Sequence, residues 1–211
     1  MLISEAGLET NTVHLCGEIM EAPVFSHETY GESFYTFILG VERNSGYEDK
    51  LNVMVSERLL CFYKLTPGDT VLVSGQIRTY NEQVNGRNKL IIVVFAREME
   101  IVDRDEGHFN QVYLEGFICK IPIGRVSPLG RRICDIMLAV NRMYNKSDYI
   151  PCIAWGRNAI FAEKLSVGDK ISLTGRMQRR EYGKRMDDGS CETRTAFEVS
   201  ILQLENCREW W

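Results

Sequence analysis

This 211-residue sequence has few of the residues that bind zinc, because it contains only three histidines and no closely spaced pair of cysteines. Its three histidines, His14, His27 and His108, do not lie at ligand spacing from a cysteine pair. The seven cysteines are odd in number and form no C-x-x-C motif. Several, such as Cys134 and Cys152, alternate in phase with apolar residues. We therefore expect no metal, no cofactor and no disulfide, with free thiols in a reducing compartment.

Long apolar segments are also absent. The longest run, LIIVVFA from Leu90 to Ala96, is far shorter than the roughly 20 residues of a membrane-spanning helix and predicts a buried strand. The first nine residues, MLISEAGLE, are acidic, which is not typical of a signal peptide. These features predict a cytoplasmic protein that does not bind membranes.

The motifs of common enzyme classes are missing too. The sequence has no G-x-x-x-x-G-K-[ST] loop, no H-E-x-x-H, and no serine or cysteine nucleophile beside a recognisable base. The segment GKRMDDGS, from Gly183 to Ser190, lacks a strand–helix context and predicts a hairpin tip. Its Asp187 and Asp188 are expected to be solvated rather than to bind metal. We expect no enzymatic activity.

The sequence does contain an internal duplication. NTVHLCG recurs as NQVYLEG, which places Gly116 at 99 positions after Gly17. FILGVER then matches IMLAVNR, and LTPGDTVLVSG matches LSVGDKISLTG, in the same order and at nearly the same spacing. Such a duplication predicts two similar domains rather than an array of short repeats. We place them at residues 1–104 and 105–211, joined by the charged segment DRDEGHFN.

Each copy has the pattern of an all-β domain, with short alternating apolar stretches bounded by turn residues. One short helix is expected between the third and fourth strands, at residues 56–64 and 157–165, the second with Asn158 as its N-cap. This is the layout of a five-stranded OB-fold barrel, which binds ligands over strands 2 and 3 and the 1–2 and 4–5 loops. The expected strands are Val13–Met20, Phe34–Arg43, Leu51–Val55, Thr70–Tyr80 and Lys89–Val102, then Val112–Ile121, Arg132–Arg142, Tyr149–Trp155, Lys170–Tyr182 and Thr193–Leu204.

The third strand of the second copy has an unusual outer face. In DYIPCIAWGR the alternation turns Ile150, Cys152 and Ala154 towards the core. The other face then carries Tyr149, Pro151, Ile153 and Trp155, whereas the matching face of the first copy carries Lys50, Asn52, Met54 and Ser56. Since the first copy lacks aromatic residues there, the barrel itself does not require them. Exposed rings of this kind are suited to stacking on the bases of single-stranded nucleic acid.

These motifs together resemble the bacterial single-stranded DNA-binding protein family. The similarity lies in NxVxLxG at the start of each copy, MLAVNR in strand 2, CIAWGR in strand 3 and GRMQRREY leading into strand 5. It extends over nearly the whole second copy but only over the scaffold of the first. The resemblance implies a cytoplasmic, non-enzymatic, sequence-independent binder of single-stranded DNA in replication, recombination and repair. It also implies four barrels around the DNA, which a two-barrel chain reaches as a homodimer.

The resemblance further implies four aromatic positions on the binding surface. The second copy fills them with Tyr144, Tyr149, Trp155 and Tyr182, and the first copy has Ser45, Lys50, Ser56 and Glu82. The first copy is therefore expected to have a degenerate binding face and to act as scaffold or interface, although Tyr47 and Tyr80 lie close to these positions and could replace the rings in part. An alternative for Tyr149 and Trp155 is packing in a subunit interface, where aromatic residues are common.

Charge divides between the copies in the same way. Residues 1–105 hold nine lysines and arginines against 16 acidic residues, whereas residues 106–211 hold 16 against 13. Cations are needed for phosphate binding, because releasing counterions supplies much of the affinity. The DNA-binding cations that we expect are Arg125, Arg131 and Arg132 in the 1–2 loop, and Arg176, Arg179, Arg180, Lys184 and Arg185 in the 4–5 hairpin.

Two other functions stay open from the sequence. A protein-interaction module similar to primosomal barrel proteins would suit the acidic first copy, and stacking platforms alone do not distinguish RNA from DNA. Members of the family usually end in a flexible tail with an acidic tip that recruits partners. This sequence ends at LENCREWW, so recruitment by that route is not expected, and no role is predicted for Trp210 and Trp211.

Overall fold

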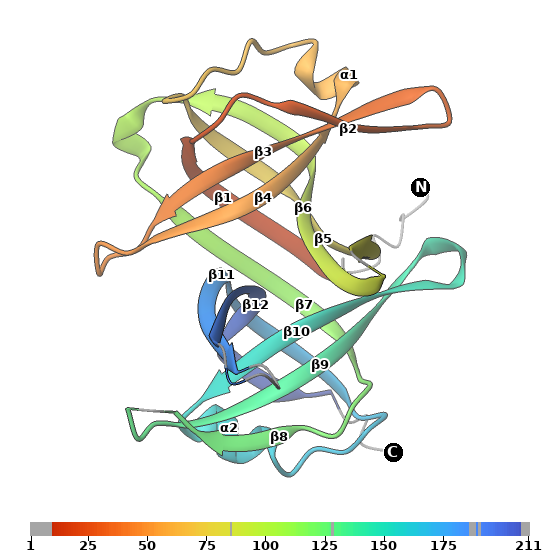
Figure 1. The fold of residues 1–211 in the computed structure, drawn as a ribbon, viewed down its shortest axis with the longest axis vertical. Coiled ribbons are helices and arrows are strands. Elements are labelled where there is room, and N and C mark those ends of the chain that lie inside the picture. Colours follow the sequence, from red (N-terminus) through yellow and green to blue (C-terminus); the bar gives the residue numbers. More distant parts are fainter. Residues whose placement is uncertain (1–9, 85, 128, 186–188, 190, 208–211) are drawn as a thin grey trace, which may run out of the picture.

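The computed structural model describes residues 10–84, 86–127, 129–185, 189 and 191–207. Its strands form two closed five-stranded barrels, one from each copy, stacked along the long axis of the molecule (Figure 1). We call them barrel 1 and barrel 2. The expected all-β class with two tandem OB-fold barrels is confirmed, and each barrel has one short helix after its third strand.

Barrel 1 closes through five pairings. The strand β1 pairs with β3 and β5, β3 with β4, β5 with β6, and β4 runs parallel to β6. Alternate residues of these strands, such as Leu15, Leu39 and Val53, are buried in the centre of the barrel. The strands are β1 (Asn11–Ile19), β3 (Glu32–Glu42), β4 (Glu48–Ser56), β5 (Thr70–Val84) and β6 (Arg87–Val102).

Barrel 2 repeats this closure. Its first strand β7 pairs with β9 and β11, and β10 pairs with β9 and, in parallel, with β12. The residues expected to face the core from β10, Ile150, Cys152 and Ala154, are all buried. The strands are β7 (Phe109–Ile118), β9 (Arg132–Arg142), β10 (Lys146–Trp155), β11 (Lys170–Arg185) and β12 (Cys191–Asn206).

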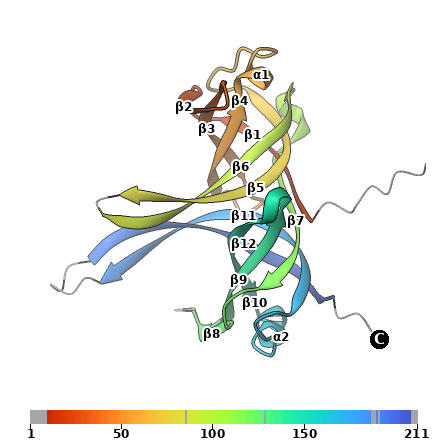
Figure 2. The same ribbon diagram turned by 90° about the vertical axis from the view of Figure 1, so that its right-hand side faces the viewer.

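Each barrel also carries a short additional strand that the sequence did not predict. In barrel 1, β2 (Val24–Thr29) pairs with β3, and in barrel 2, β8 (Ile123–Val126) pairs with β9. Every residue of both strands is exposed. The β5–β6 and β11–β12 hairpins also run beyond the barrels and project side by side from one face of the molecule (Figure 2). The strands β2 and β8, which we call arms, and the two hairpins flank the outer faces of β3–β4 and β9–β10.

The two α-helices are shorter than expected, α1 spanning Glu57–Leu60 and α2 spanning Arg157–Ala162. The expectation that Asn158 caps α2 is wrong. The N-cap position is Gly156, and the amide of Asn158 instead donates a hydrogen bond to the Leu202 carbonyl at 3.0 Å. Two 3-10 turns, Arg104–Glu106 and Met143–Asn145, complete the elements. No helix in the described ranges has the length and apolarity needed to cross a membrane.

The NxVxLxG motif of each copy has a clear structural basis. The Asn11 side chain bonds both the carbonyl and the N–H of Ile77, at 2.8 and 2.9 Å, and Asn110 does the same with Met177. Both asparagines thus take the place of a strand partner just past the β-bulges at Ser74/Gly75 and Thr174/Gly175. The glycine allows the barrel to close, because a Cβ at Gly116 would lie 2.4 Å from the Ala139 carbonyl oxygen.

The two barrels share one continuous sheet. Their first strands, β1 and β7, pair antiparallel from Asn11–Leu114 to Cys16–Phe109. The order β6-β5-β1-β7-β11-β12 therefore runs through both barrels. Each first strand is consequently hydrogen bonded both within its own barrel and to the first strand of the other barrel. This shared pairing fixes the orientation of the two barrels relative to each other.

Two buried aspartates form a second connection between the barrels. Asp148 of β10 accepts hydrogen bonds from the Thr79 N–H, at 2.7 Å, and from Arg78 on β5 of barrel 1. Its counterpart Asp49 of β4 accepts from the Arg179 N–H on β11 of barrel 2, at 3.1 Å. Both side chains are at most 1% exposed. Each barrel thus fixes the third strand of the other through a carboxylate.

Candidate nucleic-acid interface

The predicted site residues of barrel 2 gather on the side of the molecule from which the two hairpins project. The strands β9 and β10 form the floor of this surface, β8 lies along one edge, and the β11–β12 hairpin rises at the other (Figures 1 and 2). In the cross-strand register Trp155 lies opposite Ile133, and Ile133 lies opposite Arg125 on β8. Directly opposed residues share a face, so the aromatic ring and the guanidinium lie on the same outer surface.

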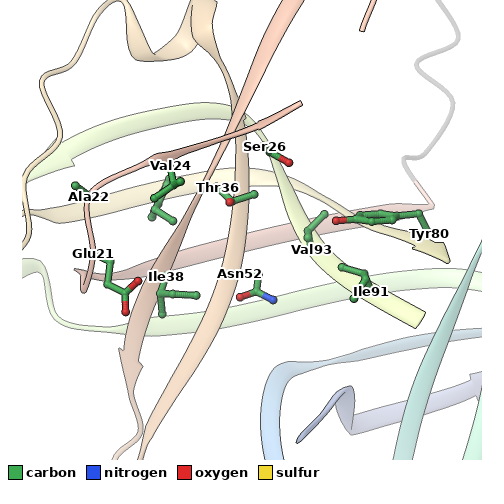
Figure 3. Close-up of a pocket in the computed structure, with 11 residues that line it drawn as sticks. Glu21, Ala22, Val24, Ser26, Thr36, Ile38, Asn52, Tyr80, Ile91 and Val93 are labelled. Atoms are coloured by element: carbon green, nitrogen blue, oxygen red, sulfur yellow. The ribbon is translucent and has the colours of Figure 1, made fainter. Parts of the chain in front are cut away.

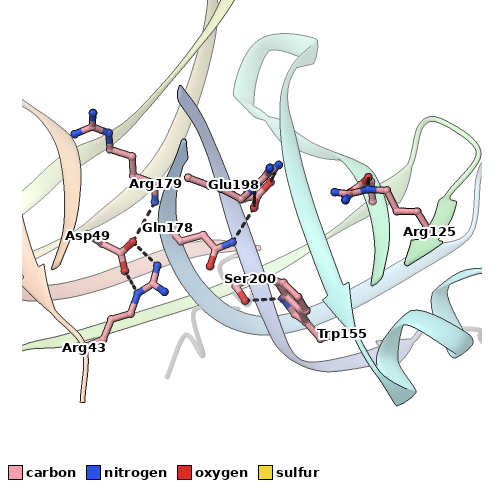
Figure 4. A network of polar contacts seen from close by, with 10 residues as sticks. Arg43, Asp49, Arg125, Trp155, Gln178, Arg179, Glu198 and Ser200 are labelled. Atoms are coloured by element: carbon pink, nitrogen blue, oxygen red, sulfur yellow. Dashed lines mark hydrogen bonds and ion pairs between the residues drawn. The ribbon is translucent and has the colours of Figure 1, made fainter. Parts of the chain in front are cut away.

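Trp155 is held in a fixed position at one end of this surface. It is partly buried, and its Nε1–H donates a hydrogen bond to the Ser200 hydroxyl on β12 at 3.1 Å (Figure 4). The next residue, Gly156, has φ of 55°, which turns the chain sharply into α2 and is favourable for glycine. The indole therefore presents one orientation towards solvent instead of sampling several.

Tyr149 lies at the opposite end of β10 and depends on barrel 1 for its position. Its side chain is 51% exposed, and its residue opposite on β9 is the small Ala139. The backbone N–H of Tyr149 donates to the Thr79 hydroxyl of barrel 1 at 3.0 Å. Together with the adjacent Asp148 contacts, this bond fixes the strand from which the ring projects.

The remaining two predicted tyrosines are placed at the periphery. Tyr144 is 91% exposed in the 3-10 turn after β9, with φ of 62°, an uncommon conformation for a residue with a side chain. Tyr182 is 38% exposed on the β11–β12 hairpin, where the Arg180 guanidinium lies 5.3 Å from its ring centroid. The four aromatics therefore line the rim and both ends of the surface.

Four of the predicted arginines, Arg179 among them, are paired with carboxylates, and the pairs of the other three have bidentate or near-bidentate geometry. Arg125 donates to Asp135 through Nε and Nη2, at 2.6 and 3.0 Å, and these bonds raise the pKa of its guanidinium. The Nε of Arg132 donates to Glu163 at 3.0 Å, and that of Arg180 donates to Glu198 at 3.1 Å. Such bidentate or near-bidentate pairs orient the guanidinium, while leaving further N–H donors for another anion.

The other predicted cations have more varied surroundings. Arg131 is exposed in the β8–β9 turn, whereas Arg179 donates through its backbone to Asp49 and through its side chain to Glu181. Arg176 is influenced by Arg43 and Asp49 of barrel 1, and burial, followed by repulsion from Arg43, lowers its pKa. It therefore belongs to the junction between barrels. The side chains of Lys184 and Arg185 lie outside the described residues, although β11 includes both positions.

One part of the outer face is covered, contrary to expectation. Ile153 lies between Tyr149 and Trp155 on β10 but is only 1% exposed. Nearby on the hairpin, the Gln178 amide donates to buried Glu198 at 2.7 Å, and Arg180 binds the same carboxylate (Figure 4). The alternation along β10 predicted that its whole outer face would be open. Buried Ile153 instead separates the partly buried Trp155 from the exposed Tyr149 along this face.

Barrel 1 carries aromatic side chains that alignment with barrel 2 did not reveal. The ring of Phe34 on β3 stacks against His27 on β2, with 5.1 Å between centroids, and lies 5.9 Å from Phe95 on β6. Period-two alternation along β3 places Phe34, Thr36 and Ile38 on one face, and this signal was available from the sequence. The sequence could not show that His27 and Phe95 lie beside Phe34, because pairing between strands that are distant in the chain brings them together.

Metal-binding side chains do not cluster in the described part of the chain. There, no group of three or more histidine, cysteine, aspartate or glutamate residues is arranged to hold a metal ion. Burial raises the pKa of Cys134 to about 11 and also raises the pKa of Cys152. Both thiols are therefore protonated at neutral pH, and a protonated thiol is a poor metal ligand. The acidic pair of the hairpin tip and the two C-terminal tryptophans lie outside the described residues, at positions 187, 188, 210 and 211.

Comparison with known sequences identifies relatives of the second copy. The model of the single-strand binding protein family matches residues 109–206. Single-stranded DNA-binding protein B of Bacillus subtilis is 32% identical over 84 residues, which cover 35% of this chain and 72% of that protein. Protein A of the same organism is 35% identical over 105 residues, or 46% of this chain, and Single-stranded DNA-binding protein 2 of Listeria innocua is 34% identical over 88 residues, or 36% of this chain. The chain spans 61% and 55% of the length of these last two relatives.

Comparison of structures extends over both barrels. The crystal structure of the wild-type single-stranded DNA binding protein from Thermus aquaticus superimposes with a TM-score of 0.73 and 22% sequence identity. The match covers 95% of this chain and 94% of the other. A deletion mutant of the same protein gives the same TM-score. At this level of identity the likeness establishes a shared two-barrel fold.

Proposed function

This chain belongs to the single-strand binding protein family, and on that premise we propose that barrel 2 binds single-stranded DNA without regard to base sequence. The observation that carries the proposal is that Trp155 on β10, oriented by Ser200, and Arg125 on β8 share the outer face of barrel 2. Binders of single strands combine such stacking rings with cations along the backbone path. The protein acts as a binder with no catalytic step.

Stacking on Trp155 supplies base contacts that do not depend on sequence. Every base has a flat π-face, and each stacked base contributes about 1–3 kcal/mol. Because the hydrogen bond to Ser200 already fixes the indole, little side-chain entropy is lost when a base stacks on it. Tyr149, Tyr144 and Tyr182 would extend the same contact to further bases along the surface.

Phosphate contacts come from arginines whose carboxylate partners leave donors unused. A guanidinium has five N–H donors, and Asp135 engages those on Nε and Nη2 of Arg125. The remaining donors would bind phosphate without breaking the ion pair. Arg131, Arg132, Arg179 and Arg180 would act similarly along the two edges, with Arg176, Lys184 and Arg185 contributing along β11. Binding should therefore weaken as salt rises.

The wider assignment follows from the family. We place the protein in DNA replication, recombination and repair, in the cytoplasm, as a homodimer that presents four barrels. We divide the chain at residues 104 and 105, within the turn Arg104–Glu106 that joins β6 to β7. Barrel 1 acts at least as a scaffold, because its Thr79 and Arg78 hold Asp148 and Tyr149 of β10 in place.

Substitution of Trp155 tests the proposal. Binding of labelled oligo(dT) would be measured by fluorescence anisotropy for the parent protein and for Trp155→Ala, at two salt concentrations. The alanine variant should lose about ten- to a hundred-fold in affinity, the equivalent of one stacked base of about 1–3 kcal/mol. The loss should be similar for oligo(dT) and mixed sequences, because stacking does not sense the base edges.

Trp155→Phe is the matched control. It keeps a ring for stacking and loses only the hydrogen bond to Ser200, so most of the affinity should remain. The melting temperature and the mass in solution would be recorded for all three proteins. Unchanged oligo(dT) affinity in the alanine variant, or a changed oligomeric mass that accounts for the loss, would assign Trp155 to packing instead of DNA.

A further inference from the structure

The aromatic cluster of barrel 1 occupies the place that corresponds to Trp155 in barrel 2. Phe34 lies directly opposite Ser56 in the β3–β4 register, as Ile133 lies opposite Trp155 in β9–β10. Since directly opposed residues share a face, Phe34 projects from the same outer surface as Ser56. The ring missing from β4 is thus supplied by the neighbouring strand.

The parallel pairing gives the same correspondence for the second ring. Phe95 of β6 is registered with Met54 of β4, and its counterpart Ser200 of β12 is registered with Ile153 of β10. In barrel 2 this serine holds the Trp155 indole, whereas in barrel 1 a phenylalanine contacts Phe34 at 5.9 Å. Trp155, Ile133 and Ser200 of barrel 2 therefore correspond to Ser56, Phe34 and Phe95 of barrel 1. In barrel 1 the exposed His27 also stacks against the ring of Phe34.

A groove on the face of barrel 1 begins beside this cluster, at Ser26 next to His27 and at Thr36, two residues after Phe34 on β3. It encloses about 260 Å³ between the β2 arm and the β5–β6 hairpin (Figure 3). Thr36, Ile38 and Asn52 lie along its floor, with Tyr80 and Ile91 on the hairpin side. Tyr80 is 44% exposed, so the groove has an accessible aromatic ring of its own. An apolar groove with a ring and scattered polar groups suits bases rather than a metal or a small anion.

The other end of the groove is basic and leads to barrel 2. A second cavity of about 560 Å³ shares Glu21, Ile38 and Asn52 with the first and is lined by three cations, Lys50, Lys89 and Arg179. A third continues from Asn52 and Lys89 to Phe197 and Pro151, on β12 and β10 of barrel 2. The face of barrel 1 is thus continuous with the surface that carries Tyr149.

We propose that Phe34, Phe95 and His27 form a second stacking site for single-stranded DNA, from which the strand follows the groove past Asn52 to Lys50, Lys89 and Arg179. The site rests on the proposed function, because one strand is taken to pass over both barrels. Its cations outnumber Glu21 along the two adjoining cavities, so the acidic composition of the first copy does not determine the charge of this face. The first copy therefore binds DNA through rings at other positions than those of the family pattern.

Replacement of the cluster by the residues of the sister barrel tests the site. Phe34→Ile with Phe95→Ser introduces residue types that Ile133 and Ser200 show the fold to accept at these places. The double variant should bind long oligo(dT) about tenfold more weakly than the parent, and its stoichiometric site size should fall by about four nucleotides or more. Affinity for an oligonucleotide short enough to be held by barrel 2 alone should not change.

Phe117→Ala, which removes a 40% exposed ring from β7 outside the groove, is the matched control and should leave site size unchanged. Ultraviolet crosslinking of oligo(dT) to the unmutated protein should place thymine on a peptide containing Phe34 or Phe95, which covers the case of a poorly folded variant. Absence of these crosslinks together with an unchanged site size would overturn the second site while leaving barrel 2 as a DNA binder. A parent protein that binds no oligo(dT) at all would instead overturn the proposed function.

Discussion

Asp148 shows how a single residue serves both the fold and the surface beside it. Its carboxylate is fully buried, accepts from the Thr79 N–H and Arg78 of barrel 1, and lies 3.4 Å from Arg142. The next residue along β10 is Tyr149. Burial of a charge is costly unless it is paired and hydrogen bonded, and here two arginines and a backbone donor provide that compensation. The charge thus links the barrels and positions a proposed stacking ring.

Asp148→Asn should therefore lower the free energy of unfolding by about 3–5 kcal/mol, because it leaves two partly buried guanidinium groups without their counter-ion. Asp135→Asn is the control, since it breaks a pair with Arg125 in which both side chains are about 40% exposed, and should cost about 1 kcal/mol or less. Urea denaturation of both variants would measure the difference. Equal losses would show that the Asp148 contacts are not the stronger connection.

At the scale of the element, the first strand of each copy determines how its barrel closes. The strands β1 and β7 each contact two strands of their own barrel and also one another. Asn110 replaces a backbone partner beside the β11 bulge, and Gly116 allows β7 to cross close to β9. The NxVxLxG motif is thus explained by the requirements of barrel closure.

Gly116→Ala should accordingly destabilise barrel 2 by about 1–3 kcal/mol or more, because its Cβ would meet the Ala139 carbonyl oxygen, a backbone atom that cannot move aside cheaply. The neighbouring substitution Glu115→Ala removes a partly exposed ion pair with Lys170 and a hydrogen bond from the Tyr113 hydroxyl at 3.3 Å, and should cost about 1 kcal/mol or less. Thermal unfolding followed by circular dichroism compares the two. A glycine variant as stable as the glutamate variant would contradict this account of the motif.

At the scale of the whole molecule, both candidate binding faces lie on the side from which the hairpins project (Figure 2). The far side is the continuous sheet through both barrels, where exposed His14 and Gln111 are directly paired across β1 and β7. A homodimer formed through this sheet would leave all four binding faces open. Such an interface is isologous, so each substituted residue would be present in it twice, once from each protomer.

We therefore expect light scattering at micromolar concentration to give about twice the 24.3 kDa chain mass. His14→Glu with Gln111→Glu should shift this mass towards that of one chain, since it places four like charges at the twofold interface. The affinity for a short oligo(dT) should be retained, because these residues lie away from Trp155. A single-chain mass for the parent protein would contradict the homodimer.

Local patterns in the sequence were enough to predict the duplication, the ten barrel strands and the inward residues of β10, because strand alternation and turn residues are local properties. It did not reveal β2 and β8, whose residues are all exposed and show no buried face. It also placed Ile153 on an open surface, and it pointed to Tyr47 and Tyr80, not to Phe34 and Phe95, as rings that could serve barrel 1. Contacts such as Asp148 with Thr79, Phe34 with Phe95 and Trp155 with Ser200 join residues that are 45 to 69 positions apart in the chain. Only the closed barrels and their shared sheet decide these contacts, because non-local strand pairing brings together side chains that no local pattern relates.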